Sequence, residues 1–215
     1  MTASTAAGST ANNEPANRRS QLKSDRRTQL LKAAERLFAQ SGYLAVRLED
    51  IGAAAGVSGP AIYRHFAGKE ALLVELLVGI STRLLAGARA VDADGRTPRQ
   101  VLDGLIDFHL DFALGEPDLI RIQDRDLAQL PAAAQRQVRS AQRQYVEVWV
   151  GVLQALKPGL AETDARLMAH AAFGLLNSTP HSMKPSGSDS AGPERSRAVL
   201  RAMTISALGA PTSRP

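Results

Sequence analysis

Residues 48–66, LEDIGAAAGVSGPAIYRHF, decide the fold of this 215-residue chain. The first half carries Leu48, Ile51 and Ala55 at positions i, i+3 and i+7, which is the apolar face of a short helix. Gly56 comes next, and glycine readily adopts the positive φ at which many helices end. The stretch therefore predicts a short helix closed by a tight turn, with a second element directly after it.

The second element is predicted to be another short helix with a polar outer face. Ser58 is a favourable N-cap residue, and Ile62 and Phe66, four residues apart, are expected to face inward. The outer face then consists of Gly59, Pro60, Ala61 and Arg64, and the helix also carries Tyr63 and His65. A helix–turn–helix unit whose second helix is basic and bears hydroxyl groups is typical of a protein that enters a DNA groove. The alternative is an ordinary αα-hairpin, which needs no such groups outside.

The flanking segments extend the pattern. Residues 25–43 form an amphipathic helix, and an apolar helix opens after 68–70. Three helices followed by G-V-S-x-x-x-[IL]-Y-x-H-F-x-x-K-E-x-L resemble the N-terminal domain of the TetR family of bacterial one-component regulators. The residues that match are Gly56, Val57, Ser58, Ile62, Tyr63, His65, Phe66, Lys69, Glu70 and Leu72. The resemblance is close over residues 24–90, and the remainder fits only as a helical body.

The resemblance implies two kinds of DNA contact, to phosphates and to base edges. The residues implied to hold phosphates are Ser58, Tyr63, His65 and Lys69. The residues implied to approach base edges are Gly59, Pro60, Ala61 and Arg64. Hydroxyl groups and ammonium groups suit phosphate oxygens, whereas an arginine fork also fits guanine. The alternative for each residue is a solvated polar side chain with no partner.

Two positions depart from the family pattern. Arg47 stands where the family usually has Thr or Ser, so it cannot cap the first motif helix but reaches a phosphate by charge. Gly52 stands where the family usually has Ala; it weakens the helix by roughly 1 kcal/mol, or it permits closer helix packing. Neither departure removes the DNA-binding interpretation.

Composition favours an all-α protein that acts on an anionic partner. Residues 1–70 carry 10 Lys and Arg against 6 Asp and Glu, whereas residues 71–215 carry 16 against 15. The positive charge therefore lies with the candidate DNA-binding unit, as a phosphate-binding surface requires. The chain has no cysteine, which excludes disulfides and thiolate metal sites. No run of about 18 apolar residues is present, so we expect no membrane span and a cytoplasmic location.

The chain is expected to divide into four parts. Residues 1–23 form a disordered basic tail, 24–70 the DNA-binding domain, 71–209 an effector-binding and dimerising body, and 210–215 a second tail. Helices are predicted over 68–89, 98–114, 117–128, 131–156, 160–178 and 193–208, with a polar loop at 180–193. The basic residues at the start are Arg18, Arg19, Lys23, Arg26 and Arg27; they form either an arm that follows DNA into the minor groove or an inert tail.

The last two predicted helices are apolar nearly all round. Such helices are buried on more than one side, which a small protein achieves by pairing them across a two-fold axis. The residues expected in this homodimer interface are Leu167, Met168, Ala171, Leu175, Leu200, Met203 and Ile205. The family resemblance implies the same four-helix interface. The alternative is the core of a monomer.

Polar groups among apolar ones in the middle helices indicate a small-molecule pocket. The expected lining is Phe108, His109, Phe112, Gln123, Gln142, Tyr145, Trp149, His170, Phe173 and Asn177. The stretches LIRIQDRDL (119–127), QYVEVWVGVL (144–153) and FGLLNSTPHS (173–182) resemble TetR regulators of acyl-CoA and lipid metabolism. That resemblance implies a long acyl-CoA as effector, with Arg121 or Arg125 at a basic entrance. The alternative for each residue is ordinary core packing.

The sequence therefore predicts a ligand-controlled transcriptional regulator, a repressor that leaves its operator when an effector binds. No nucleotide-binding loop, nucleophile elbow or zinc-protease motif is present, and the four histidines form no metal-ligand pattern, so we expect no enzyme, cofactor or metal. One rival is an activator or a DNA-binding protein without a ligand. The other is a helical enzyme or carrier that binds an acyl thioester.

Overall fold

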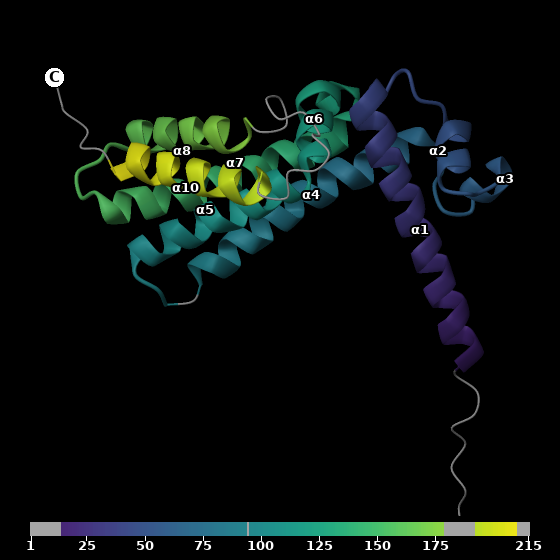
Figure 1. Ribbon diagram of the computed structural model, residues 1–215, viewed down its shortest axis with the longest axis horizontal. Helices are drawn as coiled ribbons and strands as arrows, with labels where there is room; N and C mark the ends of the chain where they lie inside the picture. Colours follow the sequence, from purple (N-terminus) through teal and green to yellow (C-terminus); the bar gives the residue numbers. More distant parts are fainter. Residues whose placement is uncertain (1–13, 94, 179–191, 210–215) are drawn as a thin grey trace, which may run out of the picture.

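The computed structural model describes residues 14–93, 95–178 and 192–209, and in these ranges the chain is helical without a strand (Figure 1). The predicted all-α class is confirmed. The α-helices are α1 (Glu14–Ser41), α2 (Leu48–Ala54), α3 (Gly59–Ile62), α4 (Lys69–Asp92), α5 (Pro98–Gly115), α6 (Pro117–Asp126), α7 (Ala132–Leu156), α8 (Glu162–Leu176) and α10 (Gly192–Gly209). A 3₁₀ turn at Leu127–Gln129 follows α6.

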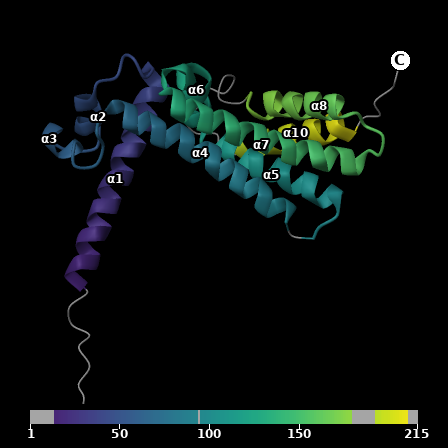
Figure 2. The ribbon, with the colours of Figure 1, turned by 180° about the vertical axis from the view of Figure 1, so that it is seen from behind.

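The helices form two groups at opposite ends of the molecule. α1, α2 and α3 lie together at one end, and α5, α7, α8 and α10 pack into a bundle at the other, as both views show (Figures 1 and 2). α4 runs from the first group into the second, packed along α7, and α6 lies where the two groups meet, against α1. The molecule therefore has two ends connected by one long helix and one short one.

Each end has its own apolar core, and α4 contributes to both. The core of the end formed by α1, α2 and α3 contains fully buried Phe38, Ile51 and Ile62, together with Leu73 and Leu77 from the N-terminal half of α4. The bundle core takes Leu85 and Ala88 from the C-terminal half of the same helix. The predicted division after residue 70 therefore falls inside a region that belongs structurally to the first core.

α1 begins earlier than predicted. The expected disordered tail reached residue 23, but residues 14–23 are helical, and the basic residues from Arg18 to Arg27 lie on this helix rather than on an extended arm. Glu14 and Pro15 suit the first turn of a helix, and no glycine or proline follows before Gly42, whose φ of 86° closes it. The N-terminal half of α1 projects away from the rest of the molecule (Figure 1). Residues 1–13, the predicted tail 210–215 and most of the predicted loop 180–193 lie outside the described ranges; residues 192 and 193 begin α10.

The turn between α2 and α3 follows the sequence closely. Gly56 has φ 63°, as the predicted turn requires. Gly52 faces α3: a Cβ atom there would lie 2.5 Å from Ile62 Cδ1 and 2.9 Å from the Val57 carbonyl oxygen. Glycine therefore permits the close approach of the two helices, as one of the two interpretations of Gly52 predicted. Arg47 offers no capping acceptor, and the Asp50 carboxylate instead accepts from the Arg47 backbone N–H at 2.9 Å.

The predicted second helix is shorter than its sequence suggested. α3 ends at Ile62, and the chain continues through Tyr63, Arg64 and His65 in tighter turns. The Arg64 N–H donates to the Ala61 carbonyl at 3.3 Å, and the His65 N–H donates to the Ile62 carbonyl at 2.8 Å. These i to i+3 bonds keep the three polar side chains on a nearly helical path.

α4 is long and apolar enough to span a membrane by length and composition alone. Its leucines are instead covered by protein: Leu72, Leu73 and Leu77 are fully buried, and the helix packs along α7 and α5. The apolar character of α4 is thus accounted for by its place in two cores.

Candidate functional site

The outer side of the helix–turn–helix unit presents the predicted DNA-contact residues to solvent. Tyr63 is 60% exposed, and Ser58, Pro60 and Arg64 are also exposed, whereas Ala61 and His65 are half-buried. Ser58 occupies the N-cap position of α3, but its side chain makes no capping hydrogen bond. A hollow of about 270 Å³ runs from this surface to Arg26 on α1. Hydroxyl and guanidinium groups therefore converge on one concave, positively charged face.

Burial and the positive charges on this face lower the pKa of the His65 imidazole. Burial has the largest effect, and the charges are those of Lys23, Arg27, Arg26 and Arg64. Arg27 Nη1 donates to the His65 carbonyl at 2.6 Å, and the same guanidinium pairs with Glu75 and lies 4.2 Å from the centre of the Phe66 ring. Arg27 is thus partly neutralised by Glu75, while Arg26 and Arg64 form no ion pair with any other residue that the structure describes.

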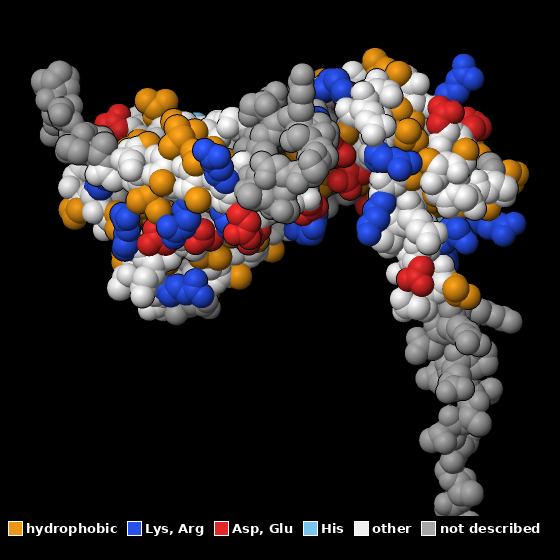
Figure 3. Space-filling view, in the orientation of Figure 1, with side chains coloured by type: hydrophobic (Ala, Val, Ile, Leu, Met, Phe, Trp, Pro, Cys, Tyr) orange, Lys and Arg blue, Asp and Glu red, His pale blue; other side chains and the backbone are white. Residues whose placement is uncertain are grey.

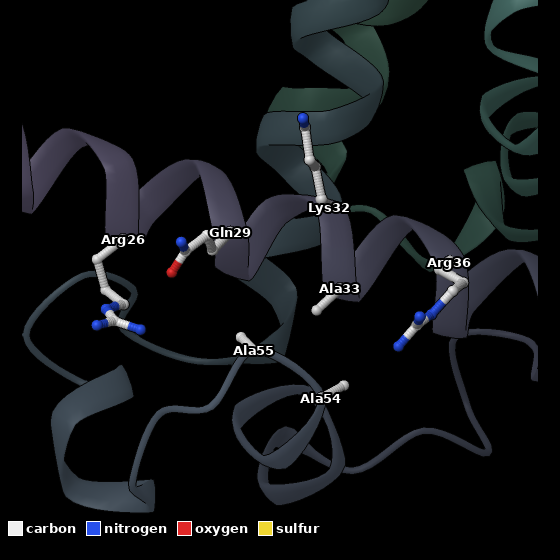
Figure 4. A pocket seen from close by; sticks show the side chains of 7 residues that line it. All are labelled: Arg26, Gln29, Lys32, Ala33, Arg36, Ala54 and Ala55. Atoms are coloured by element: carbon white, nitrogen blue, oxygen red, sulfur yellow. The ribbon is translucent and has the colours of Figure 1, made fainter.

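A second basic groove of about 570 Å³ runs between α1 and the end of α2 (Figure 4). The residues that line it are Arg26, Gln29, Lys32, Ala33, Arg36, Ala54 and Ala55. Arg26 and Arg36 reach into the space at its two ends, with Gln29 between them, whereas Lys32 points away (Figure 4). The groove shares Arg26 with the hollow beside α3, so the basic surface is continuous along α1. The sequence reasoning missed Arg36, which lies ten residues after Arg26 and less than a quarter-turn from it around the helix.

The structure gives Lys69 a different role from the predicted phosphate contact. Its ammonium donates to the carbonyls of Tyr43 at 2.7 Å and Val46 at 2.8 Å, and it lies 4.3 Å from the centre of the Tyr43 ring. Lys69 therefore fastens the loop between α1 and α2 to the start of α4. Spacing alone did not reveal this, because the carbonyls it bonds lie more than twenty residues earlier. Arg47 is exposed on the same loop and remains a candidate for phosphate.

A cavity of about 270 Å³ lies between α4, α5, α6, α7 and α8. It brings together eight of the predicted pocket residues: His109, Phe112, Gln123, Gln142, Tyr145, His170, Phe173 and Asn177. It also contains four that sequence reasoning missed: Ser81, Leu84, Ile120 and Val146. The missed residues from α4 carried no polar signal, because Leu84 continues an apolar run and the Ser81 hydroxyl bonds to its own helix at the Leu77 carbonyl.

His109 is the centre of a buried polar network in this cavity. It is only 3% exposed; its Nδ1 lies 2.9 Å from the Tyr145 hydroxyl, and its Nε2 lies 3.0 Å from Asn177 Oδ1. An amide oxygen only accepts, so Nε2 carries the proton and Nδ1 accepts from Tyr145. Burial lowers the pKa of His109 to about 4, partly offset by the bond to Asn177, and burial raises the pKa of Tyr145. Both side chains are therefore neutral at pH 7.

Four predicted pocket residues lie elsewhere. Phe108 packs on Gly87 of α4, where its ring occupies the place of a Cβ atom. Trp149 is fully buried in the bundle core; its ring centroid lies 5.0 Å from that of Phe173, but it does not line the cavity. Arg121 pairs with Asp118 at 2.6 Å and Arg125 faces α1, so neither provides the predicted basic entrance. The sequence placed these residues on the right helices but not on the right faces.

Arg125 and Asp126 instead join α6 to the end of α1. The Arg125 guanidinium donates to the carbonyls of Phe38 and Ala39 near the end of α1, and the Phe38 carbonyl also accepts from the Gly42 backbone N–H at 2.8 Å. The buried Asp126 carboxylate lies 3.1 Å from Arg125 Nη2 and accepts from the Tyr43 backbone N–H at 3.2 Å. α6 therefore touches the cavity through Ile120 and Gln123 and holds the DNA-binding end through its last two residues.

An apolar surface covers the outer side of α8 and α10, where hydrophobic side chains gather in the space-filling view (Figure 3). Leu167 is 70% exposed, and Met203 and Val199 are about half exposed. Ala171 is also exposed, whereas Met168, Leu175 and Ile205 are half-buried against the bundle core. Leu200 is a correction to the predicted interface: it is buried in its own protomer because it lies on the inward face of α10.

The geometry so far defines a class: a helix–turn–helix DNA-binding protein with a cavity in a helical body. Residues 30–76 match the family model for bacterial regulatory proteins of the tetR family, and residues 95–199 match the tetracyclin repressor-like C-terminal domain. The chain belongs to the TetR family of transcriptional regulators. Its members are ligand-responsive DNA-binding proteins.

Named relatives agree with this assignment. The HTH-type transcriptional repressor KstR2 of Rhodococcus jostii is 31% identical over 144 residues, which is 66% of this chain and 71% of that one. The HTH-type transcriptional regulator CymR of Pseudomonas putida is 33% identical over 69% of this chain and 75% of its own. These relatives are transcriptional regulators.

Solved structures share the fold. The ketosteroid transcriptional regulator KstR2 of Mycobacterium tuberculosis superposes with a TM-score of 0.74 at 23% identity, covering 88% of this chain and 96% of that one. AibR, solved in complex with isovaleryl coenzyme A and operator DNA, superposes with a TM-score of 0.68 at 20% identity, covering 83% and 97%. At these identities the likeness establishes the fold alone.

Proposed function

We propose that this protein is a cytoplasmic repressor rather than an enzyme: as a homodimer it occupies a near-palindromic operator, and it leaves the operator when a small molecule fills the cavity. The observation that carries the proposal is that one helix serves both sites. Ser81 and Leu84 of α4 line the cavity, and Leu73 and Leu77 of the same helix are buried in the core of the DNA-binding end. A shift of α4 therefore moves the recognition unit.

At DNA, Ser58, Tyr63 and Arg47 hold phosphates, and Arg64 with the first turn of α3 (Gly59, Pro60 and Ala61) reads base edges. This assignment is supported by the cations around His65 and by the exposure of Arg47, Ser58, Pro60, Tyr63 and Arg64. The groove along α1 adds Arg26 and Arg36 as contacts to flanking phosphates, since both line the groove and neither is paired with an acidic side chain in the described part of the chain. Lys69 contributes indirectly, by fixing the loop that carries Arg47.

The apolar face of α8 and α10 pairs with its copy across a two-fold axis. Leu167, Met203 and Val199 are exposed on a single protomer, and the contact of these apolar side chains with water is unfavourable. In the dimer a second copy of the same face covers them. Two recognition units then meet DNA about one helical turn apart, so the operator is a near-palindrome. Ligand-driven release follows by linkage: an effector that favours another spacing of the two units weakens operator binding by the same factor.

The sign of regulation has one rival. The HTH-type transcriptional activator FasR of Mycolicibacterium smegmatis is 35% identical over 88 residues, or 41% of this chain. Activation therefore remains the alternative to repression. The predicted acyl-CoA effector is supported by the isovaleryl coenzyme A bound to AibR, but the two arginines expected to receive it are engaged elsewhere.

The decisive experiment selects duplex DNA from a random pool with the full-length wild type, with Arg64→Ala and with Leu167→Glu. We expect the wild type to enrich an inverted repeat, and Leu167→Glu, which charges the dimer face, to lose that symmetry. A reporter driven by the selected sequence then separates repression from activation. Enrichment of no sequence, or of a single site that Leu167→Glu still binds equally well, would refute the proposal.

A further inference from the structure

We propose that the effector of this cavity is a compact, uncharged ring compound that carries hydrogen-bonding groups such as a ketone or an alcohol. The proposal rests on the proposed function and specifies the ligand of the same cavity.

The first observation is the absence of charge. None of the described residues that line the cavity is an aspartate, glutamate, lysine or arginine. His109 is held neutral by burial, so its network contributes hydrogen bonds but no charge. A charged ligand group entering this space would lose its hydration without gaining a counter-ion, which is costly.

The second observation is a set of hydrogen-bonding groups left for a ligand. The side-chain amides of Gln123 and Gln142 have no hydrogen-bond partner in the described part of the chain, although both are half-buried. The Asn177 amide uses its oxygen on His109, and among the described residues its two N–H donors have no acceptor. These amides offer donors and acceptors on more than one wall, from α6, α7 and the end of α8.

The third observation is the shape and material of the walls. The rings of His109 and Phe173 stack with centroids 5.3 Å apart and planes 23° apart, and Tyr145 lies 5.4 Å from Phe173. Phe112 lies edge-on to His109 at 5.9 Å. Aromatic walls favour flat or ring-shaped ligands, which stack or pack edge-to-face on them. At about 270 Å³ the space lies at or below the smallest pockets that hold drug-sized molecules, so the ligand is small.

These three features disfavour a whole acyl-CoA in the cavity. Such a ligand carries several phosphate charges, and the two arginines of α6 are already engaged by other protein groups. Arg121 pairs with Asp118, and Arg125 contacts α1 and Asp126. The exposed His170 marks the side on which the cavity opens. A ring compound enters there without an anionic tail to place.

The test compares matched probes on the full-length protein by isothermal titration. Indanone and indanol are the neutral probes, indane carboxylate and aminoindane are the same ring with a charge, and isovaleryl coenzyme A represents the thioester class. We expect the neutral probes to bind about tenfold or more tightly than the charged ones, because the charged groups meet no partner. Equal binding of the charged analogues, binding of isovaleryl coenzyme A alone, or binding of no ring probe would overturn the proposal.

Variants assign the binding to the cavity. Gln142→Leu removes one free amide and is expected to weaken indanone binding by ~3- to 10-fold. Gln137→Leu, an exposed position on the same helix, is the matched control and leaves binding unchanged. Gln142→Arg is expected to reverse the preference toward indane carboxylate. If both α7 variants at 142 fail to fold, Gln123→Leu repeats the test from α6. A wild-type affinity in each folded cavity variant contradicts the assignment.

Operator release is measured separately, by fluorescence anisotropy of labelled operator. Ring probes that bind but leave operator affinity unchanged support the ligand class and refute effector-driven release. Release by isovaleryl coenzyme A but not by ring probes refutes the ligand class and leaves the proposed function in place.

Discussion

The two ends of this molecule handle their functional residues in opposite ways. The DNA-binding end displays them: Tyr63 is 60% exposed and stands beside Arg64 on a four-residue helix and its continuation. The body conceals them: His109 is 3% exposed and its partners come from two other helices. The first surface is local in sequence and depends on charge, whereas the second exists only after the bundle has packed. The two ends should therefore respond to different perturbations.

The largest expected difference is in the response to acid. The pKa of His109 is about 4 in the folded protein and 6.5 for an ordinary histidine, so the unfolded chain binds more protons between these values. Stability is therefore full above pH 6.5, falls as the pH drops, and levels off below about pH 4. The loss amounts to about 3 kcal/mol. Chemical denaturation across this window should show it for the wild type.

The variant His109→Gln should flatten that dependence, because glutamine does not titrate. The exposed His170→Gln is the control and should keep the wild-type slope. An equal slope in all three proteins would mean that His109 is not the acid-sensitive group.

The next effect belongs to the DNA-binding end. Arg64→Ala should weaken operator binding by about 1–3 kcal/mol and relax the preference at one base pair, since a forked contact to guanine is lost. The unfolding midpoint should not change, because Arg64 is exposed and pairs with no acidic residue within the described ranges. Anisotropy with a set of operators mutated one base pair at a time measures both parts. A uniform loss across all operators would instead assign Arg64 to a phosphate.

Lys69→Met should have the opposite effect to Arg64→Ala: it should change the stability of the protein rather than its preference among operators. The substitution removes two hydrogen bonds from an ammonium to the Tyr43 and Val46 carbonyls, so we expect a loss of stability of about 1–2 kcal/mol. Thermal unfolding measures this. Lys32→Met, on the outside of α1, is the control and should be neutral. Unchanged stability with a weaker salt dependence of DNA binding would restore Lys69 as a phosphate contact.

The same contrast explains what the sequence predicted well. The turn at Gly56, the inward Ile62 and the outward Arg64 follow from spacing over fewer than ten residues, and the structure places all three as predicted. Local patterns also predicted the helices of the body, because their apolar periodicity is strong.

The lining of the cavity was harder to predict from the sequence, for a physical reason. Helical spacing placed Phe108 and His109 side by side, but only the packing of α4 on α5 decides that Phe108 fills the gap at Gly87 while His109 faces the cavity. Arg125 was assigned by charge to a ligand, whereas the carbonyls that bind it belong to α1 and lie more than eighty residues away. Partners that are distant in sequence leave no trace in local spacing.

A smaller effect tests the link between the two ends. Arg125→Met should remove one hydrogen-bond donor from the Phe38 and Ala39 carbonyls of α1 and cost about 1 kcal/mol of stability. Its larger consequence is in coupling: operator release by effector should weaken, while effector affinity for the free protein stays unchanged, because Arg125 does not line the cavity. Titrating effector with and without operator measures the coupling. Arg139→Met, exposed on α7, is the control. Full release by the Arg125 variant would show that α4 alone connects the sites.

The smallest expected effect is the pH response of the DNA surface itself. Burial and the cations of Lys23, Arg27, Arg26 and Arg64 lower the pKa of His65, while Glu75 neutralises part of Arg27. Operator phosphates oppose these cations, so binding raises the pKa of His65 and takes up protons. Affinity should therefore rise by about two- to threefold as the pH falls through and below 6.5. His65→Gln should remove the change, and His170→Gln should not. Since His109 acts on stability and His65 on DNA affinity, an identical pH profile for both properties would contradict the separation of the two ends.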